Sequence, residues 1–255
     1  MIYDKFPVVL ISALTSEKSN STNRIIASYI LEHADEIPGL SIKELAARCF
    51  VGIGSVSRFV RDIGLNDFSE LKALIRDTEY RFDTHDCDPD PEVRRAHHAS
   101  HLTRAVEQAV SSVDLTLVGE LCNDIRRYEK IYACGLLKAQ NAAVDLQVDL
   151  RMLGKQVYTD VSYAEQTAHI LEAGKDELII IFSYTGSYFD YPDLRAKDRH
   201  LVLPKIWMIC GSERSLPEYV NKVLRFESDG SQLSHPFQLE AIASLIAQEY
   251  AASHQ

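Results

Sequence analysis

The chain has 255 residues, of which 46% are hydrophobic and 25% charged, which is typical of soluble globular proteins and long enough for two domains. No apolar run approaches the roughly 18 residues that a membrane-spanning helix needs. The five cysteines are widely spaced and form no CxxC pair, which argues against a disulfide framework and a zinc site. We therefore expect a cytoplasmic protein with no membrane partner, metal or cofactor.

The net charge of −10 is distributed unevenly along the chain. Residues 1–82 carry 10 Lys and Arg against 11 Asp and Glu, so the remainder carries 17 against 26. The N-terminal part is thus nearly neutral and has no basic patch. If it binds DNA, binding has to depend on a few well-placed arginines and on dimerisation.

Four helices are predicted in the N-terminal part. The first spans residues 22–34, where apolar residues recur at helical spacing, and it ends at a Pro-Gly turn. The second begins at Ser41, whose spacing from Glu44 predicts a capping box. A short turn separates it from a third helix over residues 52–64, and a fourth covers residues 67–81. Two helices joined by a tight turn indicate a helix-turn-helix.

In a helix-turn-helix the second helix of the pair lies in the major groove of DNA, and its first residues reach the base edges. Here that helix contains small residues at its start, an apolar side chain suited to a thymine methyl group, and two arginines. The candidate DNA contacts are Ile53, Ser55, Ser57, Arg58 and Arg61. The alternative is a three-helix bundle that binds no DNA.

Residues 83–91 are acidic and twice interrupted by proline, which predicts a linker between a domain of residues 1–82 and one of residues 92–255. The second domain begins with two predicted helices. Short β-branched runs then alternate with helical ones, which predicts a parallel sheet covered on both faces. The expected strands are residues 131–134, 156–159, 177–182, 206–210 and 223–226, and a last helix covers residues 236–252.

A hydroxyl-rich turn follows the third expected strand. Ser183, Thr185 and Ser187 supply hydrogen-bond donors, and Gly186 lets the backbone approach a ligand closely. With a helix N-terminus behind it, such a turn is suited to binding phosphate. The alternative is an ordinary connection between a strand and a helix.

Residues 22–74 resemble the N-terminal domain of the RpiR family of bacterial regulators. The residues that carry the resemblance are Ile30, Ser41-Ile42-x-Glu44-Leu45-Ala46, Val56-x-Arg58-Phe59, Ile63-Gly64-Leu65 and Asp67-Phe68-Ser69-x-Leu71-Lys72. The sequence departs from the family at Gly52, where a capping serine is usual, and at Ser55, where threonine is usual. Glycine caps a helix only slightly less well than serine, so the fold is expected to survive.

Regulators of this family join the helix-turn-helix to a sugar isomerase (SIS) domain, and residues 131–226 resemble one. The resemblance implies an all-α domain followed by a five-stranded parallel sheet in an α/β/α sandwich. It also implies a transcription regulator rather than an enzyme. Its partners would be double-stranded DNA, a phosphorylated sugar, and further copies of the chain in a dimer or tetramer.

The first ligand loop departs from the SIS pattern. The family has a turn rich in glycine and serine after the first strand, whereas Leu136 and Leu137 follow Gly135 here. Lys138 then replaces a hydroxyl residue and supplies a positive charge for phosphate. The expected ligand contacts are Gly135, Lys138, Ser183, Thr185, Gly186 and Ser187. Aromatic and proline residues at 188–204 also interrupt the long helix expected after the second loop.

Two other functions stay open. A sugar-phosphate isomerase needs a carboxylate or histidine over the sugar. Glu165 and His169 lie one helical turn apart and could form an acid/base pair, but the surface of an amphipathic helix is the better explanation of this spacing. Alternatively, the second domain has lost its ligand and serves only for oligomerisation. The spacing of His97 and His101 allows a metal site, but without a further ligand a solvated helix face is the better interpretation.

Overall fold

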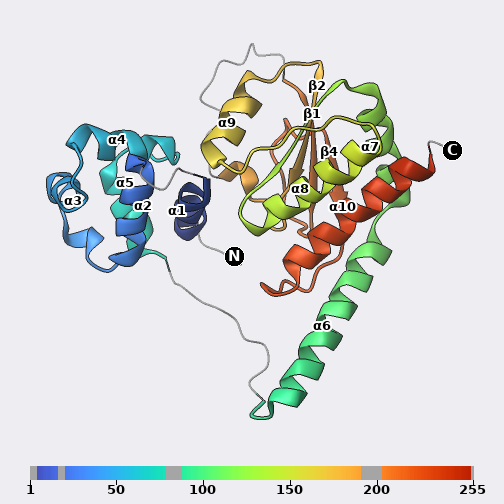
Figure 1. Cartoon of the computed structure of the whole chain (residues 1–255), viewed down its shortest axis with the longest axis horizontal. Coiled ribbons are helices and arrows are strands. Elements are labelled where there is room, and N and C mark those ends of the chain that lie inside the picture. Colours follow the sequence, from blue (N-terminus) through green and yellow to red (C-terminus); the bar gives the residue numbers. More distant parts are fainter. Residues whose placement is uncertain (1–4, 17–20, 79–87, 191–202, 254–255) are drawn as a thin grey trace.

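The computed structural model describes residues 5–16, 21–78, 88–190 and 203–253. In these ranges a group of short helices precedes a parallel sheet with helices on both faces (Figure 1). The long helix α6 (Pro91–Ser112) comes between them in the chain. The expected fold class, an all-α domain followed by an α/β domain, is confirmed. The expected linker lies outside the described residues up to residue 87, so the domain limits 1–82 and 92–255 stay proposals.

The four predicted N-terminal helices each begin within one residue of the expected start, the fourth ends at residue 76 rather than 81, and one further helix that was not predicted precedes them. Together they are α1 (Lys5–Ser16), α2 (Thr22–Glu32), α3 (Ile42–Arg48), α4 (Ile53–Asp62) and α5 (Phe68–Arg76). The capping box at α3 is present: the Ser41 hydroxyl accepts from the Glu44 N–H at 3.2 Å, and the Glu44 carboxylate accepts from the Ser41 N–H at 2.8 Å. Asp67 caps α5 in the same way. Fully buried Leu45 and Phe59 hold the helices together in one core.

The turn between α3 and α4 holds Phe50 in a left-handed conformation, with φ of 56° and a side chain 96% exposed. This backbone conformation costs a bulky residue about 1–2 kcal/mol, and because the phenyl ring is exposed, no burial of apolar surface offsets that cost. Phe50→Gly is therefore expected to raise the free energy of unfolding by about 1 kcal/mol after the entropy of glycine is subtracted. Urea denaturation should show a higher midpoint. Val161→Gly, at an exposed position with negative φ, should lower it; equal shifts would contradict the assignment.

The sheet brings the ends of its first two strands together. Its strands are β1 (Lys130–Gly135), β2 (Glu177–Phe182), β3 (Lys205–Cys210) and β4 (Lys222–Arg225), all parallel and in the order β1-β2-β3-β4. Gly135 pairs with Phe182 at the carboxyl end of β1 and β2. Because the carboxyl ends of parallel strands share one edge, the loops after these two residues lie side by side.

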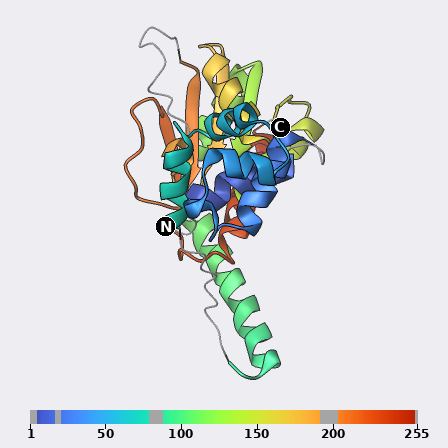
Figure 2. The same cartoon turned by 90° about the vertical axis from the view of Figure 1, so that its left-hand side faces the viewer.

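Helices cover both faces of the sheet. One face packs against α7 (Leu115–Arg127), α8 (Lys138–Met152), α10 (His235–Ala252) and the end of α6; the other packs against α9 (Tyr163–Glu172) and a short 3-10 helix (Tyr188–Asp190). The first half of α6 stands clear of the sheet in both views (Figures 1 and 2). Trp207 is fully buried, and its indole N–H donates to Asp124 at 2.8 Å.

The prediction of a fifth strand at residues 156–159 is wrong as a full strand. In the described residues this segment is reduced to one parallel bridge, in which Tyr158 exchanges hydrogen bonds with Ile131 and Ala133 of β1. Side-chain amides bind the carbonyls on either side of the bridge: Gln147 donates at 2.9 Å to the Val157 carbonyl, which points away from β1, and Gln166 donates at 2.6 Å to the Asp160 carbonyl. Gln166 of α9 thus occupies the carbonyl that would pair with β1 next along the chain.

Within the described ranges, no helix is both long and apolar enough to cross a membrane. The cysteines found there are all reduced and buried: Cys49, Cys122, Cys134 and Cys210. Cys87 lies outside those ranges.

Candidate functional site

Helix α4 presents an outer face suited to DNA. Val56, Phe59 and Val60 are buried against the neighbouring helices, which leaves the opposite face in solvent. On that face Ile53, Arg58 and Arg61 are exposed, and Ser55 and Ser57 are half-buried. No ion pair within the described part of the chain engages either arginine. Two glycines at the start of the helix leave its N-terminus open to close approach. Of the five predicted DNA contacts, three are thus exposed on the outer side of α4 and the two serines are partly exposed.

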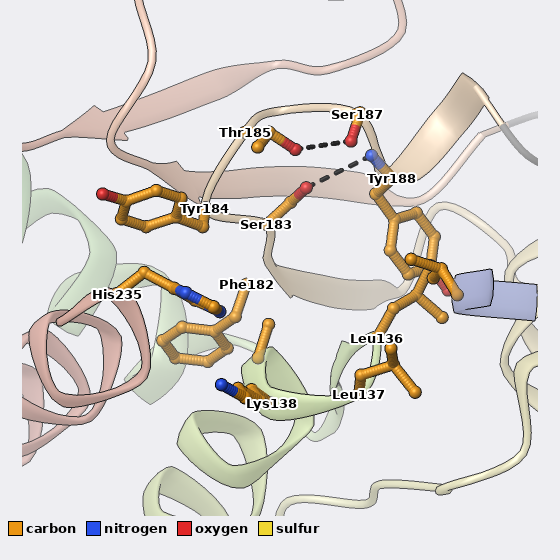
Figure 3. A pocket seen from close by; sticks show the side chains of 12 residues that line it. Leu136, Leu137, Lys138, Phe182, Ser183, Tyr184, Thr185, Ser187, Tyr188 and His235 are labelled. Atoms are coloured by element: carbon orange, nitrogen blue, oxygen red, sulfur yellow. Dashed lines mark hydrogen bonds between the residues drawn. The ribbon is translucent and has the colours of Figure 1, made fainter. Parts of the chain in front are cut away.

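A hollow of about 530 Å³, counting its open mouth, lies beyond the carboxyl ends of β1 and β2 (Figure 3). This is the edge where open parallel sheets bind ligands. Its polar lining consists of Lys138, Ser183, Thr185, Ser187 and His235, and its apolar and aromatic lining of Val8, Leu136, Leu137, Ala139, Phe182, Tyr184 and Tyr188.

The loop after β2 gathers hydroxyl groups on one wall. The Ser183 hydroxyl accepts from the Tyr188 N–H at 3.2 Å, and the hydroxyls of Thr185 and Ser187 bond to each other (Figure 3). The turn is tight because Gly186 adopts φ of 69° and donates its N–H to the Ser183 carbonyl at 2.8 Å. The loop is thereby fixed with its hydroxyls facing the hollow.

Two nitrogen-bearing side chains face these hydroxyls from helix N-termini. Lys138 begins α8, and His235 begins α10. The Lys138 ammonium donates to the Gln232 carbonyl at 3.4 Å. Burial, and next the charge of Lys138, lower the pKa of His235 to about 4. At neutral pH the hollow therefore holds one lysine charge, a neutral imidazole and two helix N-termini, a set that favours an anion.

The buried imidazole makes stability depend on pH. An unfolded histidine titrates near its ordinary pKa of 6.5, whereas His235 in the folded chain stays neutral down to about 4. The unfolded state thus binds the extra proton first, and stability falls as pH drops from about 6.5 to 4, by up to about 3 kcal/mol. Urea titrations at several pH values should show this loss in the wild type. His235→Gln should lose less over the same interval, and a parallel loss in both proteins would refute the assignment.

The first loop is closed rather than open to ligand. A Cβ on Gly135 would lie 2.7 Å from the Ala139 carbonyl, so only glycine fits there. Its N–H donates to the Gln140 side chain at 3.0 Å, and its carbonyl accepts from the Gln166 side chain at 2.9 Å. Fully buried Gln166 also receives a hydrogen bond from the Tyr188 hydroxyl. These amides occupy the backbone groups that a glycine-rich loop would offer to phosphate.

The structure brings together four of the six expected ligand contacts: Lys138, Ser183, Thr185 and Ser187. Gly135 and Gly186 shape the two loops but are not part of the lining. Sequence reasoning missed His235 and Val8, which reach the hollow from opposite ends of the chain. No local pattern marks either residue, because only the tertiary fold places them there. Of the segment 188–204, Tyr188 joins the lining, and residues 191–202 lie outside the described residues.

The histidine pairs considered from spacing lie elsewhere. His101 pairs with Asp229 at 3.0 Å, on the side of α6 that meets the loop before α10. His169 forms an ion pair with Glu177, and its ring stacks on that of Tyr132 with 3.9 Å between the ring centroids. Its partner is therefore not Glu165. Within the described ranges no three side chains are grouped as metal ligands.

Comparison with known proteins identifies the N-terminal domain. Residues 10–79 match the helix-turn-helix domain of the rpiR family. An uncharacterized HTH-type transcriptional regulator of Caldanaerobacter subterraneus is 48% identical over 50 residues, which are 20% of this chain and 18% of that protein. An uncharacterized HTH-type transcriptional regulator of Providencia stuartii is 22% identical over 188 residues, which cover 69% of this chain and 67% of that one. The chain thus matches only part of the length of these relatives.

Among solved structures, the chain is similar to the Vibrio vulnificus NanR protein complexed with ManNAc-6P. The TM-score is 0.51 at 17% identity, and the alignment covers 97% of this chain and 90% of that one. At this identity the likeness concerns the fold. It extends over both the helical domain and the sheet domain, in the same order along the chain.

Proposed function

We propose that the protein, whose N-terminal domain is a helix-turn-helix domain of the rpiR family, is a transcription regulator that binds operator DNA through α4 and a phosphorylated sugar in the hollow. The observation that carries the proposal is the opposed placement of Lys138 and the hydroxyls of Ser183, Thr185 and Ser187 around one hollow. The regulator would act in the cytoplasm.

The chemistry of the hollow supports a phosphate ester of a small polyol. Hydroxyls and an ammonium group are donors for phosphate oxygens, and the positive end of the α8 dipole adds to the attraction for an anion. The aromatic and aliphatic wall suits the carbon face of a sugar ring. Similar NanR was solved with such a compound, ManNAc-6P, which makes it one useful probe.

A sugar-phosphate isomerase is the second candidate, because His235 faces the hollow. A catalytic base works best with a pKa near the operating pH, and a pKa of about 4 makes this imidazole a weak base. The lining also contains no carboxylate among the described residues. We therefore favour a binding domain without turnover.

Binding to a palindromic operator needs two helix-turn-helix domains, so we propose that the protein acts as a homodimer or tetramer paired through its sheet domains. Because the helix-turn-helix domain has almost no net charge, each copy offers few positive charges to DNA, and pairing becomes more important. Sedimentation equilibrium tests it: a chain that remains monomeric at micromolar concentration would contradict it.

Two measurements test the proposal. A gel-shift with the DNA upstream of the gene is expected to show specific retardation at low salt, and a lack of specific retardation would refute the DNA-binding part of the proposal.

A thermal shift is expected from at least one of ManNAc-6P, glucose 6-phosphate or ribose 5-phosphate in the wild type but not in Ser183→Ala. An equal response of both proteins would remove the ligand site, and turnover of a sugar phosphate would favour the isomerase. If none stabilises the wild type, the ligandless alternative, in which the domain only oligomerises, gains support.

A further inference from the structure

The rim of the hollow contains a strained leucine. Leu137 adopts φ of 52° and ψ of −118°, a conformation that glycine reaches freely and that costs other residues about 1–3 kcal/mol. A leucine can persist there when its side chain gains contacts that offset the strain. Leu136 beside it is also apolar and also lines the hollow. The two leucines therefore need an apolar partner.

That partner is α1. Leu136 and Leu137 pack against the core of the N-terminal helices, to which Val8 and Leu10 of α1 belong. Tyr163 of α9 is buried in the same cluster, so the contact extends over two elements of the sheet domain. Val8 is 5% exposed, whereas Ile11 on the same helix is 38% exposed. Along α1 the side chain of Val8 is therefore covered, whereas that of Ile11, one turn later, is open to solvent.

The same helix is attached to the DNA-binding helices. Leu10 is fully buried among them, and the Arg24 guanidinium of α2 donates to the Leu14 carbonyl near the end of α1. Figure 1 shows α1 between α2 and the sheet domain. Because Val8 also lines the hollow, one helix touches both the ligand site and the head formed by α2–α5.

We propose that Leu136 and Leu137 form the docking surface for α1, which completes the wall of the hollow and transmits its occupancy to the head. The transmission of ligand binding rests on the proposed function, whereas the docking of α1 does not. It explains why leucines stand where a ligand loop would have glycine: the loop is built to hold a helix. A ligand that contacts Val8 favours the docked arrangement, and this difference in affinity biases the position of the head.

Hydrogen exchange on the full chain tests the docking without any ligand. In Leu137→Gly the loop backbone stays relaxed while the docking side chain is removed, so the fold should be retained. Amides of residues 8–16 are expected to exchange about 10-fold faster or more than in the wild type, while those of α4 and β2 remain unchanged. Val8→Ser should also accelerate amide exchange in α1, whereas Ile11→Ser, at an exposed position of the same helix, should not. Unchanged exchange of α1 in Leu137→Gly and Val8→Ser would overturn the docking.

A second arm tests the transmission. Operator affinity is measured with and without ManNAc-6P, glucose 6-phosphate and ribose 5-phosphate in the wild type, Leu137→Gly and Ile11→Ser. The wild type and Ile11→Ser are expected to respond to at least one probe, and Leu137→Gly to respond at least about 5-fold less. Equal responses in all three would overturn the relay. If operator affinity in the wild type responds to none of the probes, both the effector role in the proposed function and the transmission through α1 are refuted. The hydrogen-exchange result would then still test whether α1 docks on the two leucines.

Discussion

Replacing both Arg58 and Arg61 by alanine is expected to lower the affinity for operator DNA by about 100-fold, because each arginine contributes about 1–2 kcal/mol through base or phosphate contacts. The two side chains lie one turn apart on the exposed face of α4 and make no ion pair within the described residues. Their removal should therefore leave folding intact. With a head that carries almost no net charge, few other groups can substitute for them.

Fluorescence anisotropy with labelled operator DNA at several salt concentrations measures this effect. If the arginines bind phosphates, the slope of log affinity against log salt should also become shallower, by about one for each phosphate that the variant no longer neutralises. The control is the pair Arg76→Ala and Arg95→Ala, which makes the same change in net charge away from α4. A similar decrease in affinity in the control would mean that only overall charge matters and that α4 is not the helix that reads the DNA.

Lys138→Met is expected to weaken binding of the sugar phosphate by about 10- to 100-fold, since a hydrogen bond to a charged group contributes about 1.5–3 kcal/mol. Methionine keeps most of the aliphatic stem and removes only the ammonium group. The same substitution removes the charge that helps to lower the pKa of His235, so that pKa should rise. The two effects share one cause.

Calorimetry with the probe that gives the largest thermal shift measures the affinity, and NMR titration of the imidazole measures the pKa. Lys175→Met, at an exposed position before β2, provides the control for charge. If Lys138→Met raises the pKa of His235 but leaves ligand affinity unchanged, Lys138 faces the histidine without touching the ligand. Such a result would move the phosphate site toward the loop of Ser183.

The helices of the head could be predicted almost residue by residue, because their signals are local. A capping box at Ser41 and an N-cap at Asp67 satisfy backbone groups within one turn, and the apolar spacing of Val56, Phe59 and Val60 defines a buried face. The exposed face of α4 then follows by elimination. Helix α1, by contrast, lies in a run that has only apolar character, and its partners are far away in the chain.

Strands β1, β2 and β3 were also predictable, because each is a short apolar run that is buried on both faces. The expected fifth strand was not formed in full, since a competing hydrogen bond to the Asp160 carbonyl comes from Gln166 on helix α9 packed nearby. No pattern within residues 156–159 reveals that competition. Pairing in a sheet depends on what else can reach the same carbonyls.

By itself the sequence determined the order of the domains, the outer face of α4 and the hydroxyl loop from Ser183 to Ser187, since each depends on residues close together in the chain. Only the tertiary structure decided which groups meet in the hollow. There His235 arrives from the start of α10 and Val8 from α1, and the leucines of the first loop become a contact surface. The physical reason is that burial and close packing join residues regardless of their separation along the chain, whereas capping and periodicity act within a few residues.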